Sequence, residues 1–211
     1  MKKIDGWKIF TGSPKDFFEK DLVTRRCLEI AEKAKFPTDY EDMYEHLFQN
    51  EDAELFMVMN ESDEIFGFAT FDNDKDSSTA YLHGIIVHPD IQGMGFSVKL
   101  IEKAINKFKN NFLMARTHNP RVYEMMSRVS YDGIIFPNAN GKEIPKEIWN
   151  VVLSHEATKY ADESLIVRDA YPDEKVIQDV RNGEIQVMFS KLRPRDAQVI
   201  VVCTQKPNND Y

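Results

Sequence analysis

The 211-residue sequence predicts a mixed α/β fold. Short apolar segments with alternating side chains, typical of strands, are interspersed with longer segments of helical period. Their predicted order is strand, two helices, three strands, helix, strand, helix and strand, without an internal repeat. The chain is 42% hydrophobic and long enough to bury one sizeable core, so we expect a single domain over residues 1–211.

Each element of the first half has its own sequence signal. A short alternating strand is followed by Ser13 and Pro14, a cap and first position of a helix that ends before Phe36-Pro37. Two strands around the polar turn 60–64 predict a hairpin. The expected segments are strand 7–10, a helix from Ser13, helix 39–49, strands 54–59, 65–71 and 80–87, and helix 93–108.

The second half continues the pattern and then loses clarity. Strand 112–117, helix 121–129 and strand 134–136 follow the same rules. Further on, we expect a helix over 144–160 and strands over 184–189 and 197–204. Residues 138–182 show no pattern of a second core, so they are interpreted as an insertion before the last strands.

Charge and composition argue against several classes of protein. A net charge of −8 disfavours a nucleic-acid binder, which normally carries a basic surface. No apolar run of about 18 residues could span a membrane, and residues 1–5 do not resemble a secretory signal, so a cytoplasmic protein is expected. Cys27 and Cys203 are far apart and should be reduced, and no metal site is indicated.

The segment 82–97 carries the strongest chemical signal. An apolar strand ends at Pro89, and a turn with Gly93 and Gly95 opens an amphipathic helix. Glycines allow positive φ and close approach of a ligand, and the free amides at a helix start attract an anion. The spacing fits neither the Walker pattern nor the dinucleotide fingerprint, so the geometry favours another pyrophosphate ligand.

This segment resembles the signature of the GNAT N-acetyltransferase superfamily, Gln/Arg-x-x-Gly-x-Gly/Ala after a strand ending near Val-x-Pro. Val87-His88-Pro89 precedes Gln92-Gly93-Met94-Gly95-Phe96-Ser97, in which Ser97 replaces the final small residue. The resemblance implies a mixed, mainly antiparallel central sheet flanked by helices, with a C-terminal insertion or extension. It also implies acetyl-CoA as cosubstrate.

A second match follows at the family's usual distance. Asn119-Pro120-Arg121-Val122, Met126 and Ser130-Tyr131 stand where the family often has Asn-x-x-Ala, Tyr and Gly-Phe. The resemblance implies that the pyrophosphate binds at the glycine turn and the pantetheine arm along the preceding strand. The residues so assigned are Ile85, Ile86, Val87, Gln92, Gly93, Met94, Gly95, Phe96, Ser97 and Asn119.

Direct transfer of an acetyl group to an amine requires a base and a proton for the departing thiolate. His83 is the candidate base, since imidazole titrates near neutrality and arylalkylamine acetyltransferases carry histidine at the matching place. A hydrogen-bonded core histidine is the alternative. Met126 replaces the family's usual acid tyrosine and cannot donate a proton, so Tyr123 is the candidate acid, with Tyr131 or water as alternatives.

The remaining histidines receive structural interpretations. His46, His118 and His155 have no carboxylate or cysteine at a telling spacing, and His88 reads as a solvated turn residue. Phe36 and Tyr40 could line the amine pocket or pack in the core.

The resemblance therefore implies an N-acetyltransferase that acts on a primary amine of a small molecule or protein, without nucleic-acid or membrane partners. A homodimer is compatible with the sequence. Two alternatives stay open. Loss of the acid tyrosine favours a non-catalytic acyl-CoA-binding regulatory module, and an apolar helix around Ile148, Val151 and Val152 would suit a longer acyl-CoA donor.

Overall fold

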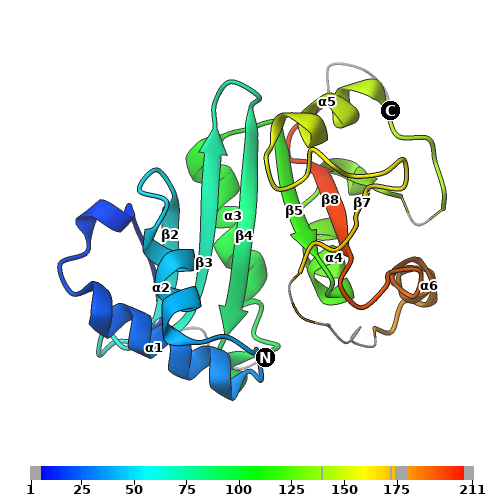
Figure 1. Cartoon of the computed structure of the whole chain (residues 1–211). Helices are drawn as coiled ribbons and strands as arrows, with labels where there is room; N and C mark the ends of the chain where they lie inside the picture. The colour runs from blue at the N-terminus through cyan, green and yellow to red at the C-terminus, as the bar shows by residue number, and fades with distance from the viewer. Residues whose placement is uncertain (1–5, 139, 172, 174–179, 207–211) are drawn as a thin grey trace. The chain divides into compact units, whose positions relative to one another are not determined.

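A computed structural model describes residues 6–138, 140–171, 173 and 180–206. They form a mixed α/β fold of mainly antiparallel strands with flanking helices, which confirms the predicted class. The chain divides into two compact units (Figure 1). The first combines the described parts of 1–73 with 82–108, and the second combines 74–81 with the described parts of 109–211.

The first unit follows the predicted order of strand, helices, hairpin, strand and helix. Helices α1 and α2 lie in front of the strands in Figure 1, and α3 lies behind them. The elements are β1 (Lys8–Gly12), the 3₁₀ turn η1 (Pro14–Asp16), α1 (Lys20–Lys33), α2 (Tyr40–Phe48), β2 (Glu54–Met59), β3 (Ile65–Asp74), β4 (Thr79–Val87), the 3₁₀ turn η2 (Pro89–Ile91) and α3 (Phe96–Phe108). Strand β3 belongs to this unit up to residue 73, and β4 belongs to it from residue 82 onward.

Strand β2 lies between β1 and β3 and is antiparallel to both, as the predicted hairpin requires. The turn between β2 and β3 is closed by Asn60, whose side-chain oxygen accepts hydrogen bonds from the amides of Ser62 and Glu64. This Asx-type turn explains why a polar five-residue segment reverses the chain here.

Capping residues fix where the helical segments begin. The Ser13 hydroxyl accepts from the amide of Lys15, and the Asp39 carboxylate accepts from the amide of Asp42 at 2.9 Å. Ser13 therefore caps the short turn η1, and α1 starts only at Lys20. The helices pack their apolar faces onto the strands in a core built from Cys27, Ile30, Ala31, Met43, Leu47, Phe48, Leu55, Met57, Ile65 and Phe68.

The second unit is organised around one buried strand, β8, every residue of which is buried. Strand β5 pairs with it antiparallel, and the two-residue strands β6 and β7 also pair with it antiparallel. The elements are β5 (Phe112–Thr117), α4 (Pro120–Ser127), the 3₁₀ turn η3 (Tyr131–Gly133), β6 (Ile135–Phe136), α5 (Lys146–Ser154), β7 (Ile166–Val167), α6 (Gly183–Phe189) and β8 (Ala197–Cys203).

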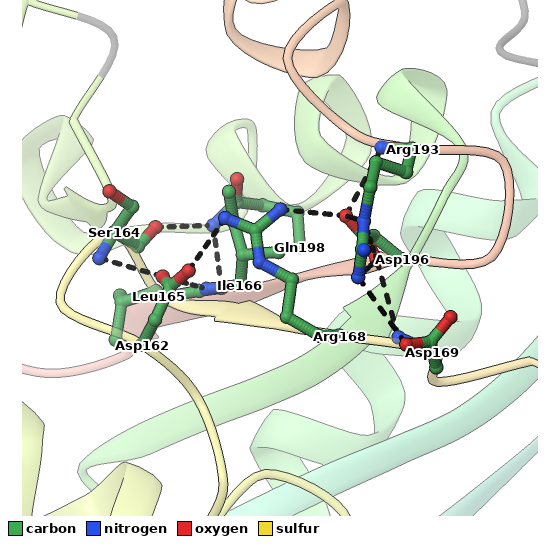
Figure 2. A network of polar contacts seen from close by, with 9 residues as sticks. All are labelled: Asp162, Ser164, Leu165, Ile166, Arg168, Asp169, Arg193, Asp196 and Gln198. Atoms are coloured by element: carbon green, nitrogen blue, oxygen red, sulfur yellow. Dashed lines mark hydrogen bonds and ion pairs between the residues drawn. The ribbon is translucent and has the colours of Figure 1, made fainter.

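A polar network ties the segment around β7 to the start of β8 (Figure 2). The fully buried Asp196 accepts hydrogen bonds from Arg168 Nη1 at 2.7 Å, from the Arg193 guanidinium and from the amide of Asp169. Gln198 donates to the main-chain oxygen of Leu165 at 2.8 Å. Burial opposes ionisation of Asp196, but hydrogen bonds from Arg193 and Arg168 hold its pKa well below the ordinary value.

One predicted strand is wrong. Residues 184–189 belong to helix α6, whose start is capped by Asn182: its side-chain oxygen accepts from the amides of Glu184 and Ile185. Ile185 and Phe189, one helical turn apart, are the buried residues of this helix. The alternation of the segment imitated a strand, and the Asn-Gly start is what distinguishes the helix.

Two smaller differences concern the region 138–182. Helix α5 ends at Ser154, shorter than expected, and the Thr158 hydroxyl donates to the main-chain oxygen of Val152 near that end. Strand β7 was not foreseen. The interpretation of 138–182 as an insertion within a single domain stays a prediction.

Both cysteines are buried free thiols. Burial raises the pKa of Cys27 far above its ordinary value and that of Cys203 to about 11, so neither is a ready nucleophile. Within the described ranges, no helix has the length and apolarity needed to cross a bilayer.

Candidate functional site

The predicted glycine turn lies at the surface of the first unit, between β4 and α3. Gly93 and Gly95 have φ of 77° and 84°, the left-handed region that favours glycine. Chain neighbours aside, no atom of the described residues lies within 4 Å of a Cβ built on either residue, so the space above the turn is open. The main chain can therefore be approached closely by a ligand.

The helix that follows offers unpaired amides to this open space. Its first intrahelical bond runs from the amide of Lys99 to the oxygen of Gly95, at 3.1 Å. The N–H groups of Phe96, Ser97 and Val98 precede that bond, as at every helix start. Such N–H groups, at the positive end of a 13-residue helix, attract an anion.

Two side chains shape the turn from within. Gln92 donates from Nε2 to the main-chain oxygen of Val87 at 2.9 Å, which fixes the turn against the end of β4. His88 is buried, and its Nδ1 accepts from the amide of Asp90 at 3.2 Å. The expectation that His88 is solvated is therefore wrong, because its ring caps η2 and packs against Phe66.

Ahead of the turn, β4 carries three of the residues assigned to cosubstrate binding. Ile85 and Ile86 are partly buried and Val87 is buried. The amide of His88 donates to the oxygen of Phe66 at 2.7 Å, which holds this end of β4 against β3. Met94 and Ser97 are partly buried and Phe96 is buried, so the turn rests on a packed base.

His83, the candidate base, lies in contact with a carboxylate. Its Nε2 lies 2.7 Å from Asp72 Oδ2, and the two side chains are 30% and 24% exposed. The second oxygen of Asp72 accepts from Asn50 Nδ2 at 2.6 Å. Asp72 is thus fixed from two sides and orients the imidazole, an arrangement suited to a base that becomes positively charged.

A second histidine, missed by sequence reasoning, lies beside the first. The rings of His46 and His83 are 6.3 Å apart and nearly perpendicular. His46 Nε2 is 3.1 Å from the Thr70 hydroxyl and would be only 2.5 Å from a Cβ on Gly84. The absence of a side chain at Gly84 therefore makes room for the imidazole.

These histidines face an open hollow of about 270 Å³, which we call the α2 hollow. Most of its wall comes from α2 and the residues just after it, and all of its wall belongs to the first unit. Its lining residues are Asp42, Glu45, His46, Gln49, Asn50, Ala53 and His83. Loss of hydration, followed by repulsion from His83, lowers the pKa of His46, whereas Asp42 opposes the shift.

Phe36 and Tyr40 are not part of this wall. Phe36 is half exposed, and the Tyr40 hydroxyl donates to Asp21 at 2.8 Å. No local sequence pattern points to His46 and Asp72, because their proximity to His83 arises only when α2 packs on the strands.

The remaining predicted residues lie in the second unit. Asn119 caps α4, with its side-chain oxygen accepting from the amide of Arg121 at 3.0 Å. Tyr123 is buried, and its hydroxyl donates to the main-chain oxygen of Pro137 at 2.8 Å. Met126 is fully buried in the same helix. Tyr131 lies at the start of η3 and is partly buried.

His118 is a further buried histidine of the second unit, 5% exposed. Its Nδ1 lies 2.8 Å from the main-chain oxygen of Asp196 and so carries the proton in the neutral ring. Within the described part of the chain, no group forms a hydrogen bond with its Nε2. A buried acceptor of this kind normally binds water or a ligand donor.

The chain matches the model of the acetyltransferase (GNAT) family over residues 24–128. This range contains α2, His83, the glycine turn, Asn119 and Tyr123. No curated protein matches the chain in sequence.

Solved structures with the same fold span nearly the whole chain. Tetrahymena GCN5 is 12% identical, with 97% of this chain and 99% of that chain covered and a TM-score of 0.54. The ribosomal-protein-S18-alanine N-acetyltransferase from Escherichia coli is 16% identical over 97% and 99%, with a TM-score of 0.53. A protein described as a putative phosphinothricin N-acetyltransferase is 11% identical over 94% and 100%, with a TM-score of 0.52. At these identities the likeness concerns the fold alone.

Proposed function

This chain belongs to the GNAT acetyltransferase family, and from that membership we propose that it transfers an acetyl group from acetyl-CoA to a primary amine. The observation that carries the proposal is the turn between β4 and α3. Two positive-φ glycines, open space above them and the unpaired amides of a helix start together suit a pyrophosphate. Neither alternative nucleotide motif matches this turn.

In this proposal the residues from Gln92 to Ser97 hold the pyrophosphate of CoA through main-chain N–H groups. The main chain of Ile85, Ile86 and Val87 pairs with the pantetheine arm as an added strand would. Asn119 keeps the assignment to cosubstrate binding that the family resemblance gives it. Bound acetyl-CoA supplies the acetyl group as a thioester. The turn fits such a ligand because its glycines carry no Cβ toward the open side.

His83 removes the proton that an ammonium must lose before it can attack. An alkylammonium has a pKa near 10, so at neutral pH almost every acceptor arrives charged. His83 takes this proton on its imidazole, and the nearby Asp72 carboxylate stabilises the resulting positive charge. The exposure of His83 lets the proton leave to solvent afterwards.

Tyr123 is the proposed donor of a proton to the departing thiolate. A phenol carries the required proton, but the Tyr123 hydroxyl donates it to Pro137 in this structure, so that hydrogen bond must break first. If Tyr123 has only a structural role, water supplies the proton.

The two alternative functions receive unequal support. Ile148, Val151 and Val152 are buried in the core of the second unit, where they pack with Val199 and Val201, so they do not form a lid for a longer acyl chain. Met126 in place of an acid tyrosine remains the observation that favours a non-catalytic acyl-CoA-binding module.

Release of CoA thiol from acetyl-CoA, measured with a panel of primary amines, tests the proposal. We expect turnover with at least one amine and none without an amine. Saturable binding of acetyl-CoA with no turnover across small-molecule and peptide amines would favour the non-catalytic module instead.

A further inference from the structure

The α2 hollow combines a proposed base with a wall of defined charge. Asp42 and Glu45 contribute two carboxylates, Gln49 and Asn50 contribute two amides, and none of the described residues that line it is a lysine or arginine. Ala53 is the only apolar lining residue among those described. A wall of this composition offers hydrogen-bond acceptors and negative charge, and little apolar area for an aryl or alkyl group.

His46 does not cancel this charge. His46 is one helical turn from Asp42. Its ring forms a hydrogen bond with the Thr70 hydroxyl and fits into the space left by the missing side chain of Gly84. His46 is exposed as a residue, but enclosure of its ring by protein, followed by repulsion from His83, lowers its pKa and so favours the neutral imidazole. Asp72, outside the hollow wall, already faces His83 and Asn50. Asp42 and Glu45 are therefore the charges that act on a ligand.

Size limits the ligand further. A volume of about 270 Å³ is slightly below the range of small-molecule sites, which span roughly 300–1,000 Å³. The hollow is open to solvent, and Asp42 and Glu45 are exposed, so a flexible chain can lie along α2 with its end at His83. One short aliphatic chain with polar ends fits these dimensions better than a fused ring system.

We propose that the α2 hollow is the acceptor subsite and that it takes a small amine with two cationic groups. One ammonium lies at His83, where it loses its proton. The second stays charged and binds the carboxylates of Asp42 and Glu45, while His46 forms an uncharged wall between the two. The role of this ligand as a substrate rests on the proposed function, whereas its binding does not.

Binding of two probes to the full chain tests the subsite. Calorimetry at pH 7.5 and low salt compares butane-1,4-diamine with butan-1-amine, without acetyl-CoA. We expect the diamine to bind about tenfold more tightly than the monoamine, since only the diamine can pair with the two carboxylates while reaching His83. Equal affinities for the two amines would overturn the proposal.

A pair of variants with the same change in net charge separates the hollow from the general surface. Asp42→Asn with Glu45→Gln should weaken diamine binding about tenfold and abolish the advantage of the diamine over the monoamine. Glu32→Gln with Glu41→Gln alters exposed carboxylates on α1 and α2 outside the hollow and should change neither. Equal losses in both double variants would show attraction by overall charge only and would overturn the subsite.

Turnover then distinguishes this inference from the function on which it rests. Diamine binding that depends on Asp42 and Glu45, without acetylation of any amine, would contradict the transferase proposal and leave the subsite standing. Acetylation of both amines with equal kcat/KM, unaffected by the Asp42 and Glu45 changes, would contradict the subsite and leave the transferase standing.

Discussion

His83 Nε2 lies 2.7 Å from Asp72 Oδ2, and the other oxygen of Asp72 is held by Asn50. Asp72 thus orients the imidazole of His83, and Asn50 in turn orients Asp72. Both His83 and Asp72 retain contact with solvent. A purely structural ion pair at this exposure would contribute little to stability. The pair lies beside an open hollow, and we propose that it removes a proton from an entering ammonium.

Removal of the imidazole tests this use. His83→Gln should lower kcat by about 10²- to 10³-fold, because general-base catalysis typically contributes that much. Affinity for acetyl-CoA should be retained, since His83 is not assigned to cosubstrate binding. Asp72→Asn should have a smaller effect, about tenfold on kcat, with Asp76→Asn in the exposed turn after β3 as control. Full activity of His83→Gln at neutral pH would rule out His83 as the base.

Gly84 controls the position of His46. In Gly84→Ala the new Cβ would lie 2.5 Å from His46 Nε2, and the ring, as the far end of a side chain, can move away. We expect a loss of stability of no more than about 1 kcal/mol in urea unfolding, together with weaker diamine binding to the altered hollow. Gly183→Ala, at a glycine with no atom within 4 Å of the added Cβ, is the control for a harmless glycine substitution. Unchanged binding in Gly84→Ala would show that His46 does not shape the hollow.

The pKa shift of His46 makes a testable contribution to acid sensitivity. Its pKa is lowered on folding, so the unfolded chain binds the proton more readily. The contribution of His46 to stability is therefore complete above the unfolded pKa of about 6.5 and falls as the pH drops below it. His46→Gln should flatten the dependence of unfolding free energy on pH in that range. An identical slope in wild type and variant would contradict the assigned shift.

Asp196 should dominate the stability of the second unit. Replacement by Asn removes the negative charge that accepts hydrogen bonds from two arginines and from the amide of Asp169. We expect the free energy of unfolding, measured by chemical denaturation, to fall by about 2–4 kcal/mol. Because its pKa is lowered, the stabilisation is present above the unfolded pKa of about 3.9 and is lost as the pH falls toward the folded value. Asp173→Asn, at an exposed carboxylate, should have little effect. A loss below 0.5 kcal/mol for Asp196→Asn would mean that the network in Figure 2 does not hold β7 to β8.

The first unit was predictable because its signals are local. The hairpin at 60–64 and the strand-to-helix change at the glycine turn are each encoded within a few residues. The predicted cap Ser13 does start a helical turn, but that turn is η1 and not the long helix expected there. The family resemblance, stated on two short motifs, is confirmed by a match over residues 24–128.

The remaining errors arose where local pattern and tertiary context disagree. Residues 184–189 alternate like a strand, but the Asn182 cap and the packing of Ile185 and Phe189 make them helical. β7 has only two residues and exists because β8 pairs with it. His46 and Asp72 stand far from His83 in the sequence, so no spacing rule could join them. The hollow is a product of packing between α2, β3 and β4.

The affinity of the glycine turn for acetyl-CoA tests the central claim most directly. Gly95→Ala and Gly133→Ala each place a Cβ at a positive-φ residue with no atom within 4 Å of it, so both should suffer similar backbone strain of about 1 kcal/mol. Calorimetric titration with acetyl-CoA should show tight binding to wild type and to Gly133→Ala, and at least tenfold weaker binding to Gly95→Ala. Equal affinity of the two variants, or no binding to the wild-type chain, would contradict the assignment of the turn between β4 and α3 as the cosubstrate site.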